Sequence, residues 1–124
     1  VLPAINQVEF HPYHYQKELL EYCNSKNIII EAYSPLVHAK RMDEPRLMAI
    51  SDELGKTPAQ VLIRWAIQRG MVVLPKSVNQ DRIVENFAVF DFDISNSLME
   101  RLDDLDERYV TCWDPHNPPP YAPV

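Results

Sequence analysis

Two kinds of hydrophobic pattern take turns along this chain, and each predicts a different element. Nearly continuous apolar runs, rich in β-branched residues, have the pattern of strands that are buried in a parallel sheet. These runs lie at residues 3–10, 28–36 and 71–75. Elsewhere apolar residues recur every three or four positions, as at Leu19, Leu20 and Cys23, which indicates an amphipathic helix over residues 16–27.

Capping residues mark where several of the expected helices begin and end. The helix at residues 57–70 is the clearest. Thr57 and Gln60 form a Thr-x-x-Gln capping box, and Pro58 takes the first helical position. Gly70 ends this helix. The other expected boundaries are Pro45 and Gly55 for a second helix, Asn79 for residues 80–87, and Ser95 or Ser97 for a last helix.

The alternation of strands and helices predicts an α/β chain whose parallel sheet is covered by outer helices. With only three expected strands, both sheet edges would stay open, and each strand is apolar on both faces. We therefore expect further strands outside this sequence, or pairing with another body. Five of the eleven prolines fall in the last ten residues, so residues 111–124 are expected to form an extended arm after a domain at 1–110.

Composition narrows the possible partners. The net charge of −6 argues against a wide nucleic-acid surface but is compatible with a local cationic pocket. No apolar stretch approaches the roughly 18 residues of a membrane-spanning helix. Nothing resembles a secretory signal, and a cytoplasmic protein is expected. Cys23 and Cys112 lack a metal-ligand spacing and are interpreted as reduced thiols, with a single disulfide as the alternative.

Polar and aromatic residues gather where the three predicted strands end. In parallel α/β sheets the carboxyl ends of the strands share one edge, where ligands bind. The residues are Asn6, Gln7, Glu9 and His11 at the first strand, Tyr33, Ser34 and Pro35 at the second, and Pro75, Lys76 and Ser77 at the third. Their convergence favours a ligand site over a set of solvated turns, which is the alternative for each stretch taken alone.

The third strand end has the parts of a phosphate site. Lys76 and Ser77 follow the strand directly, and Arg82 lies in the first turn of the next helix. An arginine there opposes the helix dipole, and a bound anion would relieve that conflict. Glu85 and Asn86, one turn later, are placed to reach a purine edge, or Glu85 pairs with Arg82. The alternative for Lys76 is an ordinary surface ion pair.

The first two strand ends suggest how a planar ligand would be held. Tyr33 offers either a ring platform, worth about 0.5–1.5 kcal/mol beyond area burial, or a core residue that closes the strand. Gln7, together with Asn6, offers hydrogen bonds to an amide. Glu9 is interpreted as a member of a buried ion pair. His11 is interpreted as a structural strand exit rather than an acid–base catalyst, because no carboxylate partner is evident in the sequence.

Four stretches together resemble one known family. They are PAINQVEFHPYHYQKELLEYC, EAYSPL, TPAQVLIRWAIQRG and VVLPKSVNQDRIVENFAVFDF. In this order, over residues 3–93, they resemble the C-terminal part of the aldo-keto reductases. The resemblance implies a (β/α)8 TIM barrel, a fold of roughly 250 residues. The three strands would be the sixth, seventh and eighth of that barrel, which binds NADPH without a Rossmann motif.

The resemblance also implies roles for individual residues. Tyr33 would stack on the nicotinamide ring, and Gln7 would bind the carboxamide of that ring. Trp113, in the C-terminal loop, would edge the substrate pocket. The other cofactor contacts implied are Ser34, Pro35 and Leu36 along the pyrophosphate, Lys76, Ser77, Val78, Asn79 and Arg82 around the adenosine 2′-phosphate, and Ala59, Glu85 and Asn86 near the adenine.

Two departures from the family pattern affect these expectations. Val37 stands where many relatives have glycine, in a short loop, so the flap over the pyrophosphate is expected to be reduced and cofactor exchange to be faster. The catalytic Asp, Tyr, Lys and His of the family have no counterparts in this sequence. No catalytic residue is therefore assigned, no metal site is expected, and the chain alone is not expected to be active.

The activity implied for an intact parent protein, expected to be a monomer, is the reduction of small aldehydes and ketones to alcohols with NADPH. Lys76 and Arg82 favour NADP(H) over NAD(H), because two cations can meet a phosphate dianion. Two alternatives remain. One is a non-catalytic nucleotide-binding or interaction fragment, which coding sequence upstream of Val1 would exclude. The other is a subunit of the potassium-channel-associated type, which the LPKSV stretch and the acidic composition make the weaker one.

Overall fold

The structure is a computed structural model of the chain and describes residues 1–115. Within these residues, three parallel strands form one sheet in the order β1-β2-β3. The strands are β1 (Ile5–Glu9), β2 (Ile29–Tyr33) and β3 (Val72–Leu74). Each strand lies inside a predicted apolar run but is shorter than that run. Pro3, Pro35 and Pro75 lie near the run ends and have no N–H to donate to the sheet.

The predicted helices form between and after the strands. They are α1 (Lys17–Ser25), α2 (Pro45–Leu54), α3 (Pro58–Gln68), α4 (Gln80–Phe87) and α5 (Asn96–Asp103), with a short turn η1 (Val37–Ala39). The Thr57 capping box is confirmed, and Asn79 caps α4. Ser95, not Ser97, caps α5. Gly55 ends α2 with a φ of 61°, a conformation that glycine adopts at little cost.

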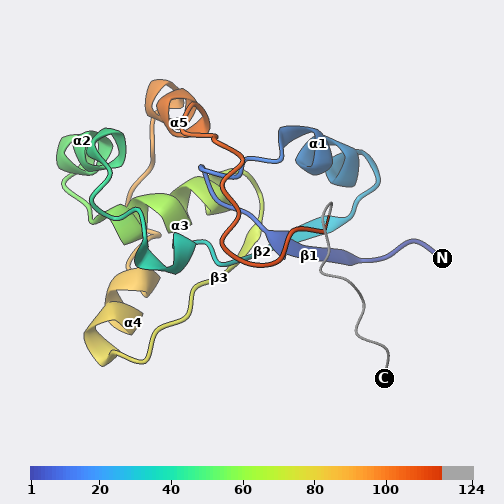
Figure 1. Cartoon of the computed structure of the whole chain (residues 1–124), viewed down its shortest axis with the longest axis horizontal. Coiled ribbons are helices and arrows are strands. Elements are labelled where there is room, and N and C mark those ends of the chain that lie inside the picture. Colours follow the sequence, from blue (N-terminus) through green and yellow to red (C-terminus); the bar gives the residue numbers. More distant parts are fainter. Residues whose placement is uncertain (116–124) are drawn as a thin grey trace.

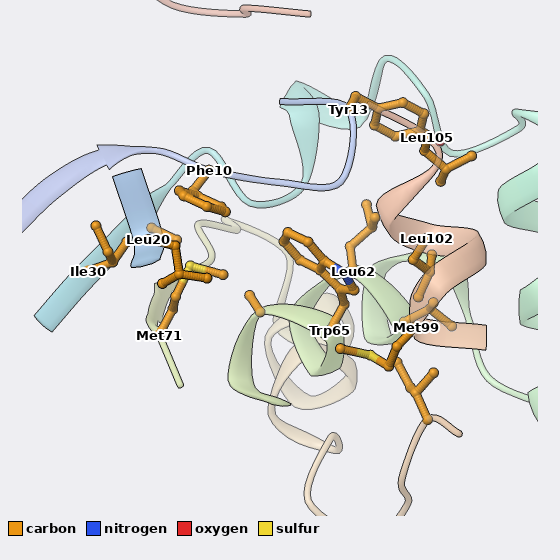
Figure 2. Packing of buried hydrophobic residues seen from close by; sticks show 14 of the residues in the cluster. Phe10, Tyr13, Leu20, Ile30, Leu62, Trp65, Met71, Met99, Leu102 and Leu105 are labelled. Atoms are coloured by element: carbon orange, nitrogen blue, oxygen red, sulfur yellow. The ribbon is translucent and has the colours of Figure 1, made fainter. Parts of the chain in front are cut away.

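The hydrophobic core lies between one face of the sheet, which contributes Ile30 and Ala32, and the helices, whose arrangement Figure 1 shows. Figure 2 shows Trp65 of α3 between Phe10, just after β1, and Met99 of α5. The indole of Trp65 is fully buried, and its Nε1 donates to Asp103 Oδ1 at 2.8 Å. Cys23 of α1 also lies in this core, as its position on an apolar helix face predicts.

The opposite face of the sheet is bare within residues 1–115. Its exposed apolar side chains are Ile5 (50%), Ile29 (49%), Val72 (44%) and Leu74 (39%). Gln7 and Glu31 project to the same side, since side chains alternate along a strand. The prediction that every strand is apolar on both faces is therefore wrong for β1 and β2. These two polar side chains meet instead, with Gln7 Nε2 donating to Glu31 Oε2.

The fold class predicted from the pattern, an α/β chain with a parallel sheet and outer helices, is confirmed. None of the helices described here is long and apolar enough to cross a membrane. The two cysteines are both free. The expected arm at residues 111–124 lies partly outside the described residues, and a division of the chain at residue 110 stays a prediction.

Candidate functional site

The carboxyl ends of the three strands are in register, so they form one rim. Glu9 pairs with Tyr33 across β1 and β2, and Tyr33 pairs with Leu74 across β2 and β3. The residues that follow each strand therefore leave the sheet side by side. One prediction about this rim is wrong: Asn6 and Gln7 lie in the middle of β1 rather than at its end, and only Glu9 occupies the rim itself.

Glu9 is the most heavily bonded residue of the rim. Its carboxylate accepts a hydrogen bond from His11 Nε2 at 2.9 Å, and both side chains are buried. It also accepts from Thr111 N at 2.7 Å and from Cys112 N at 3.0 Å. Glu9 is buried beside His11, which agrees with its interpretation as a buried ion-pair member, and the pair is ionic only when His11 is protonated. The statement that His11 lacks a carboxylate partner is wrong, because Glu9 is that partner.

These hydrogen bonds determine the charge state of Glu9. Burial raises the pKa of the carboxyl, but the hydrogen bonds from His11, Thr111 and Cys112 outweigh burial and bring the pKa to about 2. The carboxylate is thus firmly ionised and ties residues 111–112 to the end of β1. Figure 1 shows the segment after α5 running back across the molecule to reach this strand.

A cleft of about 1130 Å³ lies beside β1 at this rim. Gln7, Tyr33 and Trp113, three of the predicted site residues, all line it. Trp113 is 59% exposed, so its ring is available to a ligand. Tyr33 is half-buried at the end of β2, and burial raises the pKa of its hydroxyl. The structure therefore brings the proposed nicotinamide platform, its amide partner and the proposed substrate contact to one cleft.

The turn after β2 has an unusual backbone. Its left-handed residues are Ser34 (φ 49°), Val37 (φ 54°), His38 (φ 51°) and Ala39 (φ 59°). None of them is glycine, and for a β-branched residue such as Val37 this conformation is strained. Val37 is nevertheless fully buried. The position where the family resemblance expects glycine is thus one that needs a positive φ.

The segment after β3 carries the predicted phosphate residues. Asn79 Oδ1 accepts from Arg82 N at 3.1 Å, which caps α4, and Ser77 Oγ accepts from Asn79 N at 3.1 Å. Lys76 and Arg82 are both exposed, and neither has an ion-pair partner among residues 1–115. Val78 is 87% exposed. The alternative that Lys76 belongs to a surface ion pair finds no support within the described chain.

The predicted adenine residues lie where α3 meets α4. Glu85 does not pair with Arg82; its carboxylate accepts a 2.5 Å hydrogen bond from the Thr57 hydroxyl. Asn86 is buried, and Ala59 is half-buried in the first turn of α3. The start of α3 and the middle of α4 are thus joined just behind the cationic segment.

Sequence reasoning missed the contacts that the C-terminal segment makes. Thr111 and Cys112 are separated from Glu9 by 102 and 103 residues, and no periodicity or motif links them. A smaller hollow of about 420 Å³ lies between α2 and α5, and none of the predicted site residues lines it. Among the residues described, no group of three or more His, Cys, Asp and Glu side chains is placed to hold a metal ion.

A family model now links this geometry to known proteins. The model described as the aldo/keto reductase family matches residues 1–107, which is most of the chain. The chain belongs to the aldo/keto reductase family. The resemblance drawn from the four sequence stretches is thereby confirmed at the level of the family.

Individual relatives agree with this assignment. The chain is 46% identical over 115 residues to an uncharacterized oxidoreductase of Schizosaccharomyces pombe and 44% identical over 110 residues to the glyoxal reductase of Bacillus subtilis. A variant of Gox0644 solved in complex with NADPH superposes with a TM-score of 0.83 at 38% identity and covers 87% of this chain.

The matches cover only part of each relative. They span 93% and 87% of this chain but 42% and 40% of the two enzymes, and 40% of the Gox0644 chain. The bare face of the sheet and its two open edges fit this partial coverage, since the relatives have further chain that this sequence does not match.

Proposed function

We propose that a protein containing this chain reduces small aldehydes and ketones to alcohols with NADPH, and that this chain supplies most of the cofactor site. The observation that carries the proposal is a pair of exposed cations, Lys76 and Arg82, on either side of a capped helix start, with no ion-pair partners among residues 1–115. A 2′-phosphate needs such partners, and charge-assisted hydrogen bonds to phosphate are among the strongest in proteins.

The donor set of the chain fits the rest of the cofactor. Tyr33 offers its ring at the end of β2, and Gln7 offers an amide on the neighbouring strand. Ser34, Pro35 and Leu36 would follow the pyrophosphate, and Ala59, Glu85 and Asn86 would border the adenine. The remaining contacts to the 2′-phosphate side would come from Ser77, Val78 and Asn79.

The NADPH itself would supply the hydride. The residues of this chain bind and orient, and Trp113 would limit the pocket on the substrate side. His11 does not serve as the proton donor, because its ring is buried and its Nε2 is engaged by Glu9. We expect the proton donor to lie outside residues 1–115, because the family's catalytic residues have no counterparts in this sequence. The protein would act on its own, without nucleic acid or membrane.

The decisive experiment is a titration of the full-length protein with NADPH and with NADH, followed by protein fluorescence. Arg82→Ala is expected to weaken NADPH about tenfold to hundredfold, the range for one hydrogen bond to a charged group. NADH, which lacks the phosphate, should change little. Arg101→Ala is the control, because Arg101 lies on α5 and pairs with Glu53. Equal losses for both nucleotides, or no binding of either, would contradict the proposal.

The open face of the sheet favours a second candidate function, that of a non-catalytic binding fragment. Its apolar side chains are compatible with a chain that associates with another body. Adding an aldehyde after the same titration separates the two functions. A fragment of this kind would bind NADPH but would not oxidise it.

A further inference from the structure

A glutamine and a glutamate face each other in the middle of the bare face of the sheet. Gln7 of β1 and Glu31 of β2 are partners in the parallel register, and Gln7 Nε2 donates to Glu31 Oε2 at 2.5 Å. The positions next to Glu31 on this face are apolar, with Ile29 before it on β2 and Val72 across from it on β3. The proposed function and the comparisons give Glu31 no role.

The surroundings of this carboxylate are unfavourable for a charge. A carboxylate among apolar side chains loses its hydration when that face is covered, and proteins compensate such a group with a partner. Among residues 1–115, Glu31 has no ion-pair partner. Within the same residues its side chain makes one hydrogen bond, the one from the amide of Gln7. The amide and the carboxylate therefore form one unit.

The pairing determines how the glutamine amide is oriented. An ionised carboxylate has only acceptors, so it can pair only with the NH2 group of Gln7. The carbonyl atom Oε1 of Gln7 is then turned away from Glu31. Without such a partner, the terminal torsion of a glutamine has two comparable orientations, and either the oxygen or the NH2 group can face a ligand. Glu31 thus reduces two orientations of the Gln7 amide to one.

Gln7 lies at the cleft, whereas Glu31 lies behind it. Gln7 lines the cleft beside β1 together with Tyr33, and Glu31 is not among the residues that line it. Tyr33 is two residues after Glu31 on β2 and projects to the same side of the sheet. Glu31 therefore acts on a ligand in the cleft through Gln7 rather than by direct contact.

We propose that Glu31 is a positioning residue, which holds the Gln7 amide so that Oε1 is the atom offered to the nicotinamide carboxamide. The inference rests on the proposed function, in which Gln7 is the partner of that carboxamide. Gln7 Oε1 would accept from the NH2 group of the cofactor. The pair thereby selects a pyridine ring that carries an N–H donor. It disfavours a ring whose substituent offers only an oxygen, because two acceptors would then face each other.

The test compares NADPH with its analogue in which an acetyl group replaces the carboxamide, so that the carbonyl oxygen is kept and the NH2 group is lost. Both nucleotides are titrated into the full-length protein and followed by protein fluorescence. The wild type should bind NADPH about twofold to tenfold more tightly than the analogue, the range for one neutral hydrogen bond. Equal or tighter binding of the analogue would overturn the proposal.

The variant that isolates the role of Glu31 is Glu31→Gln, which keeps the shape of the side chain. Its new amide can donate to Gln7 Oε1, so the Gln7 amide is free to turn and to donate to the acetyl oxygen. We expect the analogue to bind about twofold to tenfold more tightly than in the wild type. A merely structural role for Glu31 would weaken both nucleotides together and keep their ratio, which would contradict the proposal. Because the ratio is taken on one variant, incomplete folding cancels.

Two further variants complete the design. Glu53→Gln is the control, because it makes the same chemical change on α2, where Glu53 pairs with Arg101, and it should leave the ratio as in the wild type. Gln7→Ala should already lose the preference for NADPH, and adding Glu31→Gln to it should change the ratio no further. A further change would show that Glu31 does not act through Gln7.

The two proposals can be separated by the same data. A wild type that binds neither nucleotide would contradict the proposed function and this inference together. Binding of NADPH with the same ratio in the wild type and in Glu31→Gln would overturn this inference alone.

Discussion

One face of the β-sheet is covered by helices, and the opposite face is exposed within residues 1–115. Ile30 points into the layer of helices and is 1% exposed, whereas Ile29, the residue before it on the same strand, is 49% exposed. The residue type and the strand are the same, so the difference comes from what covers each face. Trp65 and its neighbours complete one side. The described chain therefore owes its stability to a single layer of packing, while its other apolar face is bare.

Most of the non-glycine residues with positive φ lie in the loop after β2, and the others are Asn27 and Arg108. On the helix side, backbone groups are satisfied by regular devices such as the Thr57 capping box. At the rim of the bare face, Ser34, Val37, His38 and Ala39 adopt left-handed conformations, and the buried carboxylate of Glu9 accepts several hydrogen bonds at once. Proteins tolerate such features where geometry serves a function. The contrast agrees with the proposed location of the site at the rim.

The largest expected effect tests this contrast directly. Ile30→Ala should destabilise the chain by about 2–5 kcal/mol, the usual cost of removing a buried isoleucine. Ile29→Ala in residues 1–124 should cost less than about 1 kcal/mol, because that side chain is already half exposed. Urea unfolding followed by circular dichroism measures both.

The same two substitutions, made in the full-length protein, test whether further chain covers the bare face. If further strands close a barrel over the bare face, the cost of Ile29→Ala should rise toward that of Ile30→Ala. A small cost for Ile30→Ala in both lengths would contradict the one-sided core.

The next effect concerns Glu9, which is the only residue of β1, β2 and β3 that is buried on the bare face. Its pKa falls from 4.5 to about 2 on folding, so its ionised form is favoured in the native state. Its contribution is therefore fully present above about pH 4.5 and is lost as the pH falls toward about 2. Below that range the protonated carboxyl releases the amides of Thr111 and Cys112.

Urea unfolding as a function of pH, on the wild type and on Glu9→Gln, checks this expectation. The wild type should lose stability through the acid range, and the variant should lose less, because its amide does not titrate. Parallel pH profiles for the two proteins would show that the tie between Glu9 and the C-terminal segment does not contribute.

Much of the fold was predictable because its signals are local. The capping residues Thr57, Asn79 and Ser95 determine helix starts through contacts only three residues long. The apolar runs predict the strands for a similar reason, since burial on a parallel sheet imposes its composition on each strand separately. Each predicted run is longer than its strand, and Pro3, Pro35 and Pro75 near the run ends have no N–H to donate to the sheet.

The parts of the site that were not predicted depend on contacts between distant residues. The sequence placed Lys76 and Arg82 together because they are six residues apart and flank one helix start. It gave no sign that Cys112 meets His38, or that Thr111 donates to Glu9. The left-handed conformation of Val37 was also hidden, because valine rarely adopts it and only the comparison with glycine in relatives drew attention to that position.

A smaller loss of stability is expected from a substitution on the helix-covered side of the sheet. Thr57→Ala should destabilise the protein by about 1 kcal/mol, the typical cost of losing a helix N-cap. It also removes the hydroxyl that donates to Glu85. Thr57→Ser keeps the oxygen and should retain most of the stability. Thermal unfolding of both variants is the measurement, and an equal loss in the two would mean that the threonine methyl group, not the cap, carries the effect.

The smallest expected change in stability has opposite signs in the loop after β2 and in helix α2. Ala39 is exposed and has a φ of 59°, a conformation that costs an L-residue about 1–2 kcal/mol. Ala39→Gly should stabilise the protein by about 0.5–1 kcal/mol, because the extra freedom of glycine in the unfolded chain offsets part of the relief. Ala49→Gly, at an exposed position within α2, should instead destabilise by about 0.5–1 kcal/mol. Both glycines change the unfolded chain equally, so the difference between the two variants isolates the strain at the rim. Destabilisation by both would mean that the left-handed turn stores none.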